Sequence, residues 1–405
     1  MRSDEAAMRR LIQKGVNMEN KICVYAICKN ELQFIENWLA SMSEADYIVV
    51  LDTGSTDGTY ERLLEDPRVY KVEQKIITPW RFDTARNESM KLIPEDANIC
   101  VCTDFDELFE SGWADILRSK WIAGKHKVAW YKYAWRHDAE GKPIKIFKYE
   151  KIHDNDNWRW VYPVHENLEY IGNERLTELN LLDLFEEVYL HHYMDDTKPR
   201  SSYLDLLEIR KQEWPQELAT RNYLIQAYMH NGENLKCMQE IQETFDIFGK
   251  EINPEVGSSL YLFMGDAARA LGLTSVAELA YSNAIKTQPD YVEQYLALAE
   301  IKLLKEDYHS VVKILTECLK NASRYYVWFT RQGGDELSIY DYLAVAYSHL
   351  GDYDNAFINI FKALQLAPDN LQLQENYRII VEQINTNLKN KTENSIIRDT
   401  SPYSV

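Results

Sequence analysis

Three acidic side chains follow a short apolar segment of the sequence. Asp104, Asp106 and Glu107 come after Ile99-Cys-Val-Cys-Thr103, which has the length and composition of a buried strand. Open α/β sheets bind ligands where their strands end, so we expect these carboxylates at a ligand-binding edge. Oxygen ligands in an Asp-x-Asp pattern suit Mg²⁺ or Mn²⁺ carrying a diphosphate, although a solvated turn has the same pattern.

A second polar segment follows another apolar strand, Tyr47–Leu51. Asp52 opens the loop Asp52-Thr-Gly-Ser-Thr-Asp-Gly-Thr59, whose backbone N–H groups and following helix can bind an anion or a nucleotide. The Asp52 carboxylate can also accept hydrogen bonds from a ribose or a uracil. An Asx turn, with Asp57 as a helix cap, is the alternative interpretation.

Two further segments bring polar groups toward the same edge. Asn30 and Glu31 lie where the first strand, Lys21–Cys28, passes into a helix, and Asn30 can equally be a simple helix cap. Arg86 lies in the first turn of a second predicted helix, Ala85–Leu92. Its guanidinium can hold a phosphate through two hydrogen bonds or form an ion pair with Glu88 or Asp83.

The elements that must position these residues change in character along the chain. Residues 21 to about 110 alternate strands and helices, which predicts a mainly parallel sheet with helices on both faces. Between about 126 and 192 the strands are shorter and aromatic. Lys127–Trp135 and Lys145–Tyr149, separated by the turn at Gly141, predict an antiparallel extension of the sheet.

Beyond about residue 200 the strand patterns cease, and helical pairs follow with a period close to 34 residues. The clearest pair begins at Tyr340 and ends at Pro368. Small residues at the helix crossings, large residues between them and a final proline resemble the tetratricopeptide repeat. Residues 388–405 are rich in Asn, Thr and Ser, so we expect a disordered tail there.

The composition excludes some classes of function. The formal net charge of −19 over 405 residues argues against nucleic-acid binding, because no basic field displaces counterions from phosphates. No apolar segment approaches the ~18 residues of a membrane span, and residues 1–17 lack a signal-peptide core. The six cysteines lie in apolar segments, as buried thiols of a reducing compartment do. We expect a cytoplasmic protein with an extension (1–20) and two domains (21–200 and 201–387).

Taken in order, four segments resemble family 2 glycosyltransferases of the GT-A fold. They are Ala26-Ile-Cys-Lys-Asn-Glu31, Val50-Leu-Asp-Thr-Gly-Ser-Thr-Asp-Gly-Thr59, Ala85-Arg-Asn87 and Asp104-Phe-Asp-Glu107. Two later segments match the branch with C-terminal tetratricopeptide repeats, a layout similar to that of sublancin-type peptide glycosyltransferases: Trp160-Val-Tyr-Pro-Val-His-Glu166 and His191-His-Tyr193. The resemblance implies an α/β GT-A catalytic domain with a Rossmann-like mixed sheet, followed by an all-α repeat domain.

The resemblance also implies roles for individual residues. For the UDP-sugar donor, it assigns Asp52 to the uridine, Asp104 to the ribose or diphosphate, Arg86 and Lys145 to the phosphates, and Asn30 and Glu31 to the same site. For the Mn²⁺ or Mg²⁺ ion, it assigns Asp106, with Asp104 and with His192 or its neighbour His191 as further ligands. Glu107 becomes a supporting residue.

The resemblance further implies a catalytic base near residue 166. An inverting transfer needs a group that takes the proton of the acceptor, and we expect Glu166 to do so. Many family members have an Asp in a Glu-Asp or similar pair here, whereas this chain has His165-Glu166. His165 is therefore the alternative base, and Glu166 can instead be a metal ligand or a scaffold residue. Trp158 and Trp160 can stack on a sugar or pack in the core.

The expected function is metal-dependent, inverting transfer of a hexose or N-acetylhexosamine from a UDP-sugar to a peptide or protein side chain. The repeats would recruit that acceptor or form a homodimer, because stacked helix pairs expose extended surfaces. A glycan or cell-envelope saccharide is the alternative acceptor. A repeat scaffold with a decayed transferase domain is the alternative function. A nucleotidyltransferase would need a basic glycine-rich loop, which Lys29-Asn-Glu31 does not supply.

Overall fold

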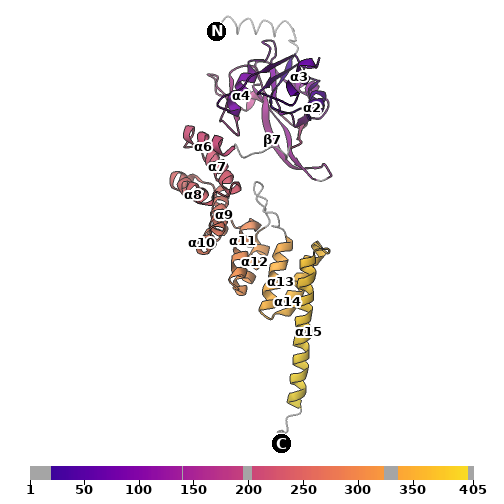
Figure 1. Ribbon diagram of the computed structural model, residues 1–405, viewed down its shortest axis with the longest axis vertical. Coiled ribbons are helices and arrows are strands. Elements are labelled where there is room, and N and C mark those ends of the chain that lie inside the picture. Colours follow the sequence, from indigo (N-terminus) through magenta and orange to yellow (C-terminus); the bar gives the residue numbers. More distant parts are fainter. Residues whose placement is uncertain (1–19, 139, 195–202, 323–335, 400–405) are drawn as a thin grey trace. The chain divides into compact units, whose positions relative to one another are not determined.

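The computed structural model describes residues 20–138, 140–194, 203–322 and 336–399, with side chains up to residue 389 (Figure 1). The chain divides into two compact units, Met1–Glu213 and Trp214–Val405. Residues 1–19 of the expected extension and the expected boundary at residue 200 lie outside the described residues.

The first half of the first unit is the predicted parallel sheet. Its strands are β1 (Ile22–Cys28), β2 (Tyr47–Asp52), β3 (Lys71–Gln74) and β4 (Ile99–Cys102). Strand β1 pairs in parallel with β2 on one side and with β4 on the other, and β2 pairs in parallel with β3. Almost every side chain of β1 is apolar and buried, as expected for a strand covered on both faces.

Three helices connect these strands: α2 (Ile35–Met42), α3 (Thr59–Glu65) and α4 (Phe82–Met90). Helix α2 begins four residues after Glu31, the start that the apolar spacing of residues 31–42 predicts. A tight turn, in which the Phe34 N–H donates to the Glu31 carbonyl at 2.9 Å, occupies the residues between. The loop after β2 supports this turn: the N–H of Glu31 donates to Thr59 Oγ1 at 2.9 Å, and the N–H of Leu32 donates to Asp57 Oδ2 at 3.2 Å.

The second half of the sheet is mixed. Strands β6 (Val128–His137) and β7 (Pro143–His153) form the hairpin predicted around Gly141, with longer strands than expected. Strand β7 is antiparallel to β4 and β6, whereas β10 (Leu181–His192) is parallel to β6 and antiparallel to β5 (Glu107–Phe109). The full order is β3-β2-β1-β4-β7-β6-β10-β5. Strands β8 (Trp158–Val161) and β9 (Asn167–Tyr170) form a separate two-stranded sheet.

The large sheet has an apolar core on each face. Helices α2, α3 and α5 (Trp113–Lys120) cover one face, where Trp38, Leu63 and Trp113 are buried. Helix α4 and the β8–β9 hairpin supply Met90 and Trp160 to the other face. All six cysteines are free and buried, which confirms their predicted burial. A short 3₁₀ helix, η1 (Glu178–Asn180), precedes β10.

Helix α6 (Tyr203–Glu213), which the sequence placed with the repeats, belongs to the first unit. Arg210 is buried, and its Nη1 donates to the backbone oxygens of Val164 and His165, both at 3.0 Å. Glu213 at the end of the helix forms an ion pair with Arg81 at 2.6 Å. These contacts bind α6 to the segment that carries Glu166.

The second unit consists of helices in consecutive pairs (Figure 1). The pairs are α7 (Leu218–His230) with α8 (Asn234–Phe248), α9 (Pro254–Ala270) with α10 (Thr274–Thr287), α11 (Val292–Leu304) with α12 (Tyr308–Asn321), and α13 (Glu336–His349) with α14 (Tyr353–Leu366). A 3₁₀ helix, η2 (Gly249–Glu251), follows α8, and α15 (Leu371–Asp399) follows the last pair. This region resembles a tetratricopeptide-repeat array, as predicted.

The first helix of each pair ends in the same left-handed turn. Gly232, Gly272, Glu306 and Gly351 have φ values of 71°, 74°, 57° and 74°. After each of them, the next N–H reaches back to a carbonyl in the last turn of the helix, as in the Schellman motif. Gly272 and Glu306 are 34 residues apart, but the outer spacings are 40 and 45, so the predicted period holds only for the middle copies.

The C-terminal end differs from the sequence-based expectation. Residues 388–399, expected to be disordered, continue helix α15, and residues 400–405 lie outside the described residues. The backbone continues from the packed part of α15, because the low helix propensity of Asn, Thr and Ser is a weak preference that adjoining structure overrides. Among the described helices, none is both long and apolar enough to cross a membrane.

Candidate functional site

The carboxyl ends of three adjacent strands gather the predicted residues at one edge of the sheet. Strand β1 lies between β2 and β4, so the loops after these strands are neighbours. The chain moves outward from β1 to β2 and later returns to the other side of β1 at β4. Such a change of direction is where open α/β sheets form a ligand-binding crevice.

Asp52 organises the loop that follows β2. It is fully buried, and its Oδ1 accepts hydrogen bonds from Gly54 N, Ser55 N and Gln74 Nε2, each at 2.9 Å. Burial raises the pKa of Asp52, but these hydrogen bonds outweigh it and hold the pKa below its ordinary value. Oδ2 faces the Cys28 thiol at 3.5 Å. The carboxylate therefore fixes the loop, and Oδ2 is the atom that a donor group would have to reach.

Asn30 and Glu31 tie the end of β1 to the same loop. The Asn30 N–H donates to Ser55 Oγ, and Asn30 Oδ1 accepts from Thr56 N, both at 2.8 Å. Asn30 adopts a left-handed backbone with φ 58°. The two loops thus form one rigid surface, in which Asn30 braces the neighbouring loop instead of simply capping a helix.

The ionic centre of the site lies at the end of β4. Arg86 of α4 is buried, and its Nη2 donates to Asp104 Oδ1 at 2.9 Å, while Lys151 Nζ lies 3.1 Å from Asp104 Oδ2. Burial raises the pKa of Asp104, but the charges of Arg86 and Lys151 outweigh it and hold the pKa well below its usual range. Both oxygens of Asp104 are thus paired with cations, and a metal-ligand role would require one of these cations to move.

Glu107 is a central member of this cluster, not only a supporting residue. It is 1 % exposed, and it accepts hydrogen bonds from the Asp104 N–H at 2.9 Å and from Tyr133 Oη at 3.0 Å. Its Oε1 also lies 3.2 Å from Lys151 Nζ. Burial raises the pKa of Glu107 even though the Lys151 charge opposes it.

Lys151 reaches the cluster because of a β-bulge. Ile152 of β7 pairs with Ala129 of β6, and Tyr149 pairs with Tyr131. These two pairs are three residues apart on β7 but only two residues apart on β6. The extra residue lies at 150–151. Bulges re-aim side chains next to functional sites, and this one turns the buried ammonium of Lys151 toward the two carboxylates.

Asp106 and His192 form the pair that is suited to a metal ion. His192 Nε2 lies 3.3 Å from Asp106 Oδ2. Burial lowers the pKa of His192, but the Asp106 carboxylate outweighs this effect, so the pKa lies above its ordinary value. Two adjacent ligands of an octahedral Mg²⁺ are about 3.0 Å apart, so this pair fits such an ion with little movement. Within the described ranges no three His, Cys, Asp or Glu side chains converge on one point, so phosphates or water would complete the coordination.

His191 points away from this pair. Successive residues of a strand face opposite ways, and His191 Nδ1 lies 3.0 Å from His137 Nε2 while its Nε2 lies 3.0 Å from Glu110 Oε1. Of the two histidines proposed as ligands, the geometry therefore favours His192.

Glu166 joins the cluster through Arg86. Its Oε1 accepts from Arg86 Nε at 2.5 Å, so one guanidinium bridges Glu166 and Asp104. The preceding His165 has a left-handed backbone with φ 50°, and its ring packs near Tyr203. Glu166 is therefore the member of the predicted His-Glu pair that reaches the ionic centre.

The two predicted tryptophans have different environments. Trp160 is buried, donates from Nε1 to Tyr25 Oη at 3.0 Å, and lies below the Arg86 guanidinium at 5.1 Å. It is a core residue that supports Arg86, not a platform for a sugar. Trp158 is only half-buried and lines a separate pocket.

Lys145 is the predicted donor-binding residue that the structure does not bring to the site. It lies six residues before Lys151 on β7, about 20 Å away at the usual rise of a strand. Its Nζ instead lies 4.9 Å from the centre of the Trp135 ring in the projecting hairpin. Lys151 supplies the positive charge expected of Lys145. The burial of Lys151–His153 is visible only in the structure, and the sequence itself offered no signal for Lys151.

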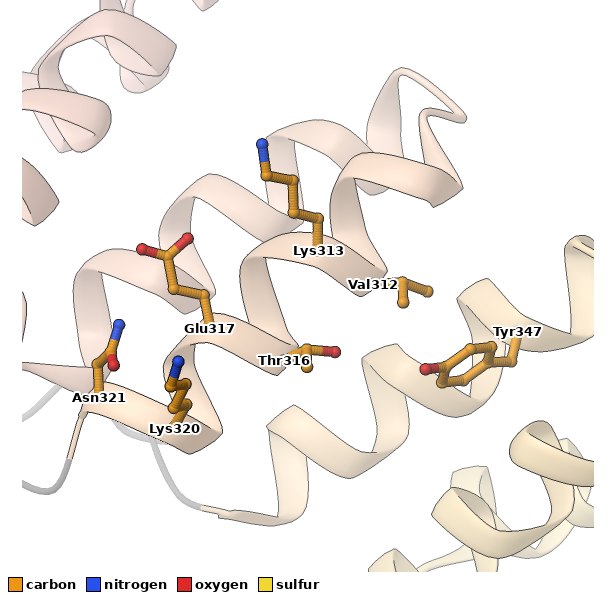
Figure 2. A pocket seen from close by; sticks show the side chains of 7 residues that line it. All are labelled: Val312, Lys313, Thr316, Glu317, Lys320, Asn321 and Tyr347. Carbon is orange, nitrogen blue, oxygen red and sulfur yellow. The ribbon is translucent and has the colours of Figure 1, made fainter.

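A groove in the second unit has a different character (Figure 2). It is lined by Val312, Lys313, Thr316, Glu317, Lys320 and Asn321 of α12, with Tyr347 of α13 pointing toward them. Two lysines alternate with one glutamate along a single helix face. None of the predicted site residues lines this groove.

Comparison with known proteins bears on the repeats alone. No protein-family model matches the chain, and no curated protein matches it. Among solved structures, that of the MamA protein is 16 % identical in sequence to this chain. The match covers 40 % of this chain and 79 % of the MamA chain, with a TM-score of 0.33. A thermophilic TPR protein from Thermus thermophilus is 20 % identical (45 % and 91 % covered, TM-score 0.30). A tetratricopeptide repeat protein from Parabacteroides merdae is 13 % identical (50 % and 73 % covered, TM-score 0.36). The helix pairs themselves, and not these low scores, support the repeat assignment.

Proposed function

We propose that the first unit is a metal-dependent glycosyltransferase, which moves a sugar from a UDP-sugar to a hydroxyl or thiol of a peptide or protein with inversion. The observation that carries this proposal is that a possible metal-binding pair and a buried ionic cluster lie at the same edge of the sheet. Asp106 and His192 form a pair that fits a divalent cation, and Arg86 bridges Asp104 to Glu166 beside it.

On the donor side, the rigid loops after β1 and β2 would hold the nucleoside. Asp52, braced by Asn30 through the shared loop, offers Oδ2 beside the Cys28 thiol. Asp106 and His192 would hold a Mn²⁺ or Mg²⁺ ion, which when bound neutralises the charge on the departing diphosphate. Arg86 and Lys151 keep Asp104 ionised and aligned next to that pair.

On the acceptor side, Glu166 would take the proton. Arg86 Nε holds Oε1, which fixes the direction of the carboxylate and leaves Oε2 to accept the proton of the attacking hydroxyl or thiol. Arg210 fixes the backbone immediately before Glu166, because it binds the carbonyls of Val164 and His165. The repeats of the second unit would recruit a peptide or protein acceptor.

The test is release of UDP from a panel of UDP-sugars with Mn²⁺, read by mass spectrometry, because water is a slow surrogate acceptor. We expect one donor to be hydrolysed, and Asp106→Asn to abolish the hydrolysis. Asp115→Asn is the matched control, since Asp115 is an exposed acid on α5. Full activity of the Asp106 variant would refute the metal assignment.

A non-catalytic repeat scaffold is the second candidate, favoured by the regular helix pairs of the second unit. A ligand that binds the folded state raises its melting temperature by mass action. Donor hydrolysis together with a melting shift by UDP and Mn²⁺ would exclude the scaffold. Absence of both effects at millimolar UDP and Mn²⁺ would refute the UDP-dependent transferase and favour the scaffold.

A further inference from the structure

A pocket separate from the ionic cluster lies between the β8–β9 hairpin and the large sheet. Its volume is about 380 Å³, and it lies within the first unit. The lining residues are Val128, Glu150, Trp158, Val161, Tyr162, Asn167, Leu168, Glu169, Tyr170 and Leu176. Arg86, Asp104, Asp106 and His192 do not line it. Glu150 and Asn167 are nevertheless the chain neighbours of Lys151 and Glu166.

Two aromatic rings form a fixed corner of this pocket. The rings of Trp158 and Tyr170 have centroids 5.2 Å apart and planes at 64°. Trp158 Nε1 donates to Asp154 Oδ1 at 2.7 Å, and Tyr170 Oη donates to Glu174 Oε1 at 3.1 Å. Because these bonds orient both rings in advance, a ligand loses little free energy in ordering them.

Two carboxylates at the pocket have acceptor oxygens to offer. Glu150 Oε2 accepts from Trp130 Nε1 at 2.7 Å, and Glu169 Oε2 accepts from Arg159 Nε at 2.8 Å. In the described part of the chain, the contacts of both side chains involve Oε2, so Oε1 of each can accept from a hydroxyl. The Asn167 side chain adds a donor and an acceptor.

We propose that this pocket binds one ring of a neutral saccharide. A pyranose has apolar C–H faces that stack on aromatic rings and hydroxyls at its edge that need acceptors, and this pocket supplies both. None of its described lining residues is Lys, Arg or His, which disfavours a phosphorylated or sulfated ligand. Arg159 neutralises Glu169, whereas Glu150 keeps its charge beside the neutral Trp130 indole, so a cationic peptide side chain is the competing ligand that the test has to separate. The inference needs neither a nucleotide nor a metal, so it stands apart from the proposed transfer.

The test is saturation-transfer NMR on the full chain without nucleotide or metal. The probes are methyl glycosides of glucose, galactose and N-acetylglucosamine, and their disaccharides. We expect saturation of the ring protons of at least one probe, with millimolar affinity, as is usual for so small a ligand. Trp158→Ala and Glu169→Ala should each weaken that binding about tenfold.

Trp135→Ala is the matched control, because Trp135 is a half-buried tryptophan on β6 that does not line the pocket. This variant should bind like the wild type. Glu169 is exposed, so its variant tests the pocket even if Trp158→Ala does not fold. No saturation of any probe, or undiminished binding in both pocket variants, would overturn the proposal. Binding of acetyl-Gly-Lys-Gly-amide in place of every saccharide would assign the pocket to a cationic peptide side chain instead.

Discussion

Replacing Lys151 by Met removes the cation that two carboxylates share. Lys151 is 6 % exposed, and its Nζ lies 3.1 Å from Asp104 and 3.2 Å from Glu107. At an effective dielectric constant of about 20, each contact corresponds to about 5 kcal/mol of attraction. Desolvation of the three groups cancels much of this. Arg86 still pairs with Asp104 in the variant, so the charge left without a partner is Glu107. We expect a loss of about 3–5 kcal/mol in the free energy of unfolding.

Urea denaturation followed by tryptophan fluorescence measures this loss, because eight of the ten tryptophans lie in the first unit. Lys148→Met is the matched control. Lys148 lies on the same strand but pairs with Asp183 at the surface, so its loss should not exceed about 1 kcal/mol. Adding Glu107→Gln to Lys151→Met should recover part of the stability, because no carboxylate is then left unpaired. A loss for Lys151→Met no larger than that of the control would refute the reasoning.

Three further predictions concern other parts of the chain. Burial lowers the pKa of His153 to about 4, so only the unfolded chain takes up a proton near pH 6 and stability falls as the pH falls. Between about pH 7 and pH 5 the wild type should lose about 2 kcal/mol more than His153→Gln, as urea denaturation at each pH would show. Gly265→Ala places a Cβ 2.2 Å from the Tyr281 ring and should cost about 1–3 kcal/mol in thermal unfolding, whereas Gly257→Ala on the same helix, with 3.5 Å of room, should cost nothing. Glu306→Gly relieves the left-handed turn and should raise stability by about 0.5–1 kcal/mol, whereas Glu306→Ala should bring no such gain, as thermal unfolding of both variants would show.

The sheet edge could be predicted because its signals are local. The apolar runs before Asp52 and Asp104 predict buried strands, and the order of strands and helices predicts that the strands are parallel. The structure accordingly places both aspartates at the ends of the two strands that flank β1. The ion pair of Arg86 with Asp104 did not follow from this pattern, which offered only Glu88 or Asp83 as acidic partners of Arg86.

The parts that the sequence did not predict depend on non-local geometry. Lys151 reaches the cluster through one extra residue in β7, and nothing in the local pattern distinguishes it from Lys145 six residues earlier. Glu107 becomes central because Tyr133 and Lys151 arrive from strands distant in sequence. The role of each acid is therefore set by which strand lies opposite, information that periodicity does not contain.

The attachment of α6 to the first unit determines where the protein can be divided. A fragment that stops at residue 200 would lack Arg210 and leave the carbonyls of Val164 and His165 without their buried donor. The segment carrying Glu166 would then lose its support, and the proposed sugar transfer should fail in such a fragment whatever the role of the repeats. A fragment that ends at Glu213 keeps this support. Only the longer fragment can show whether the proposed transfer depends on the second unit.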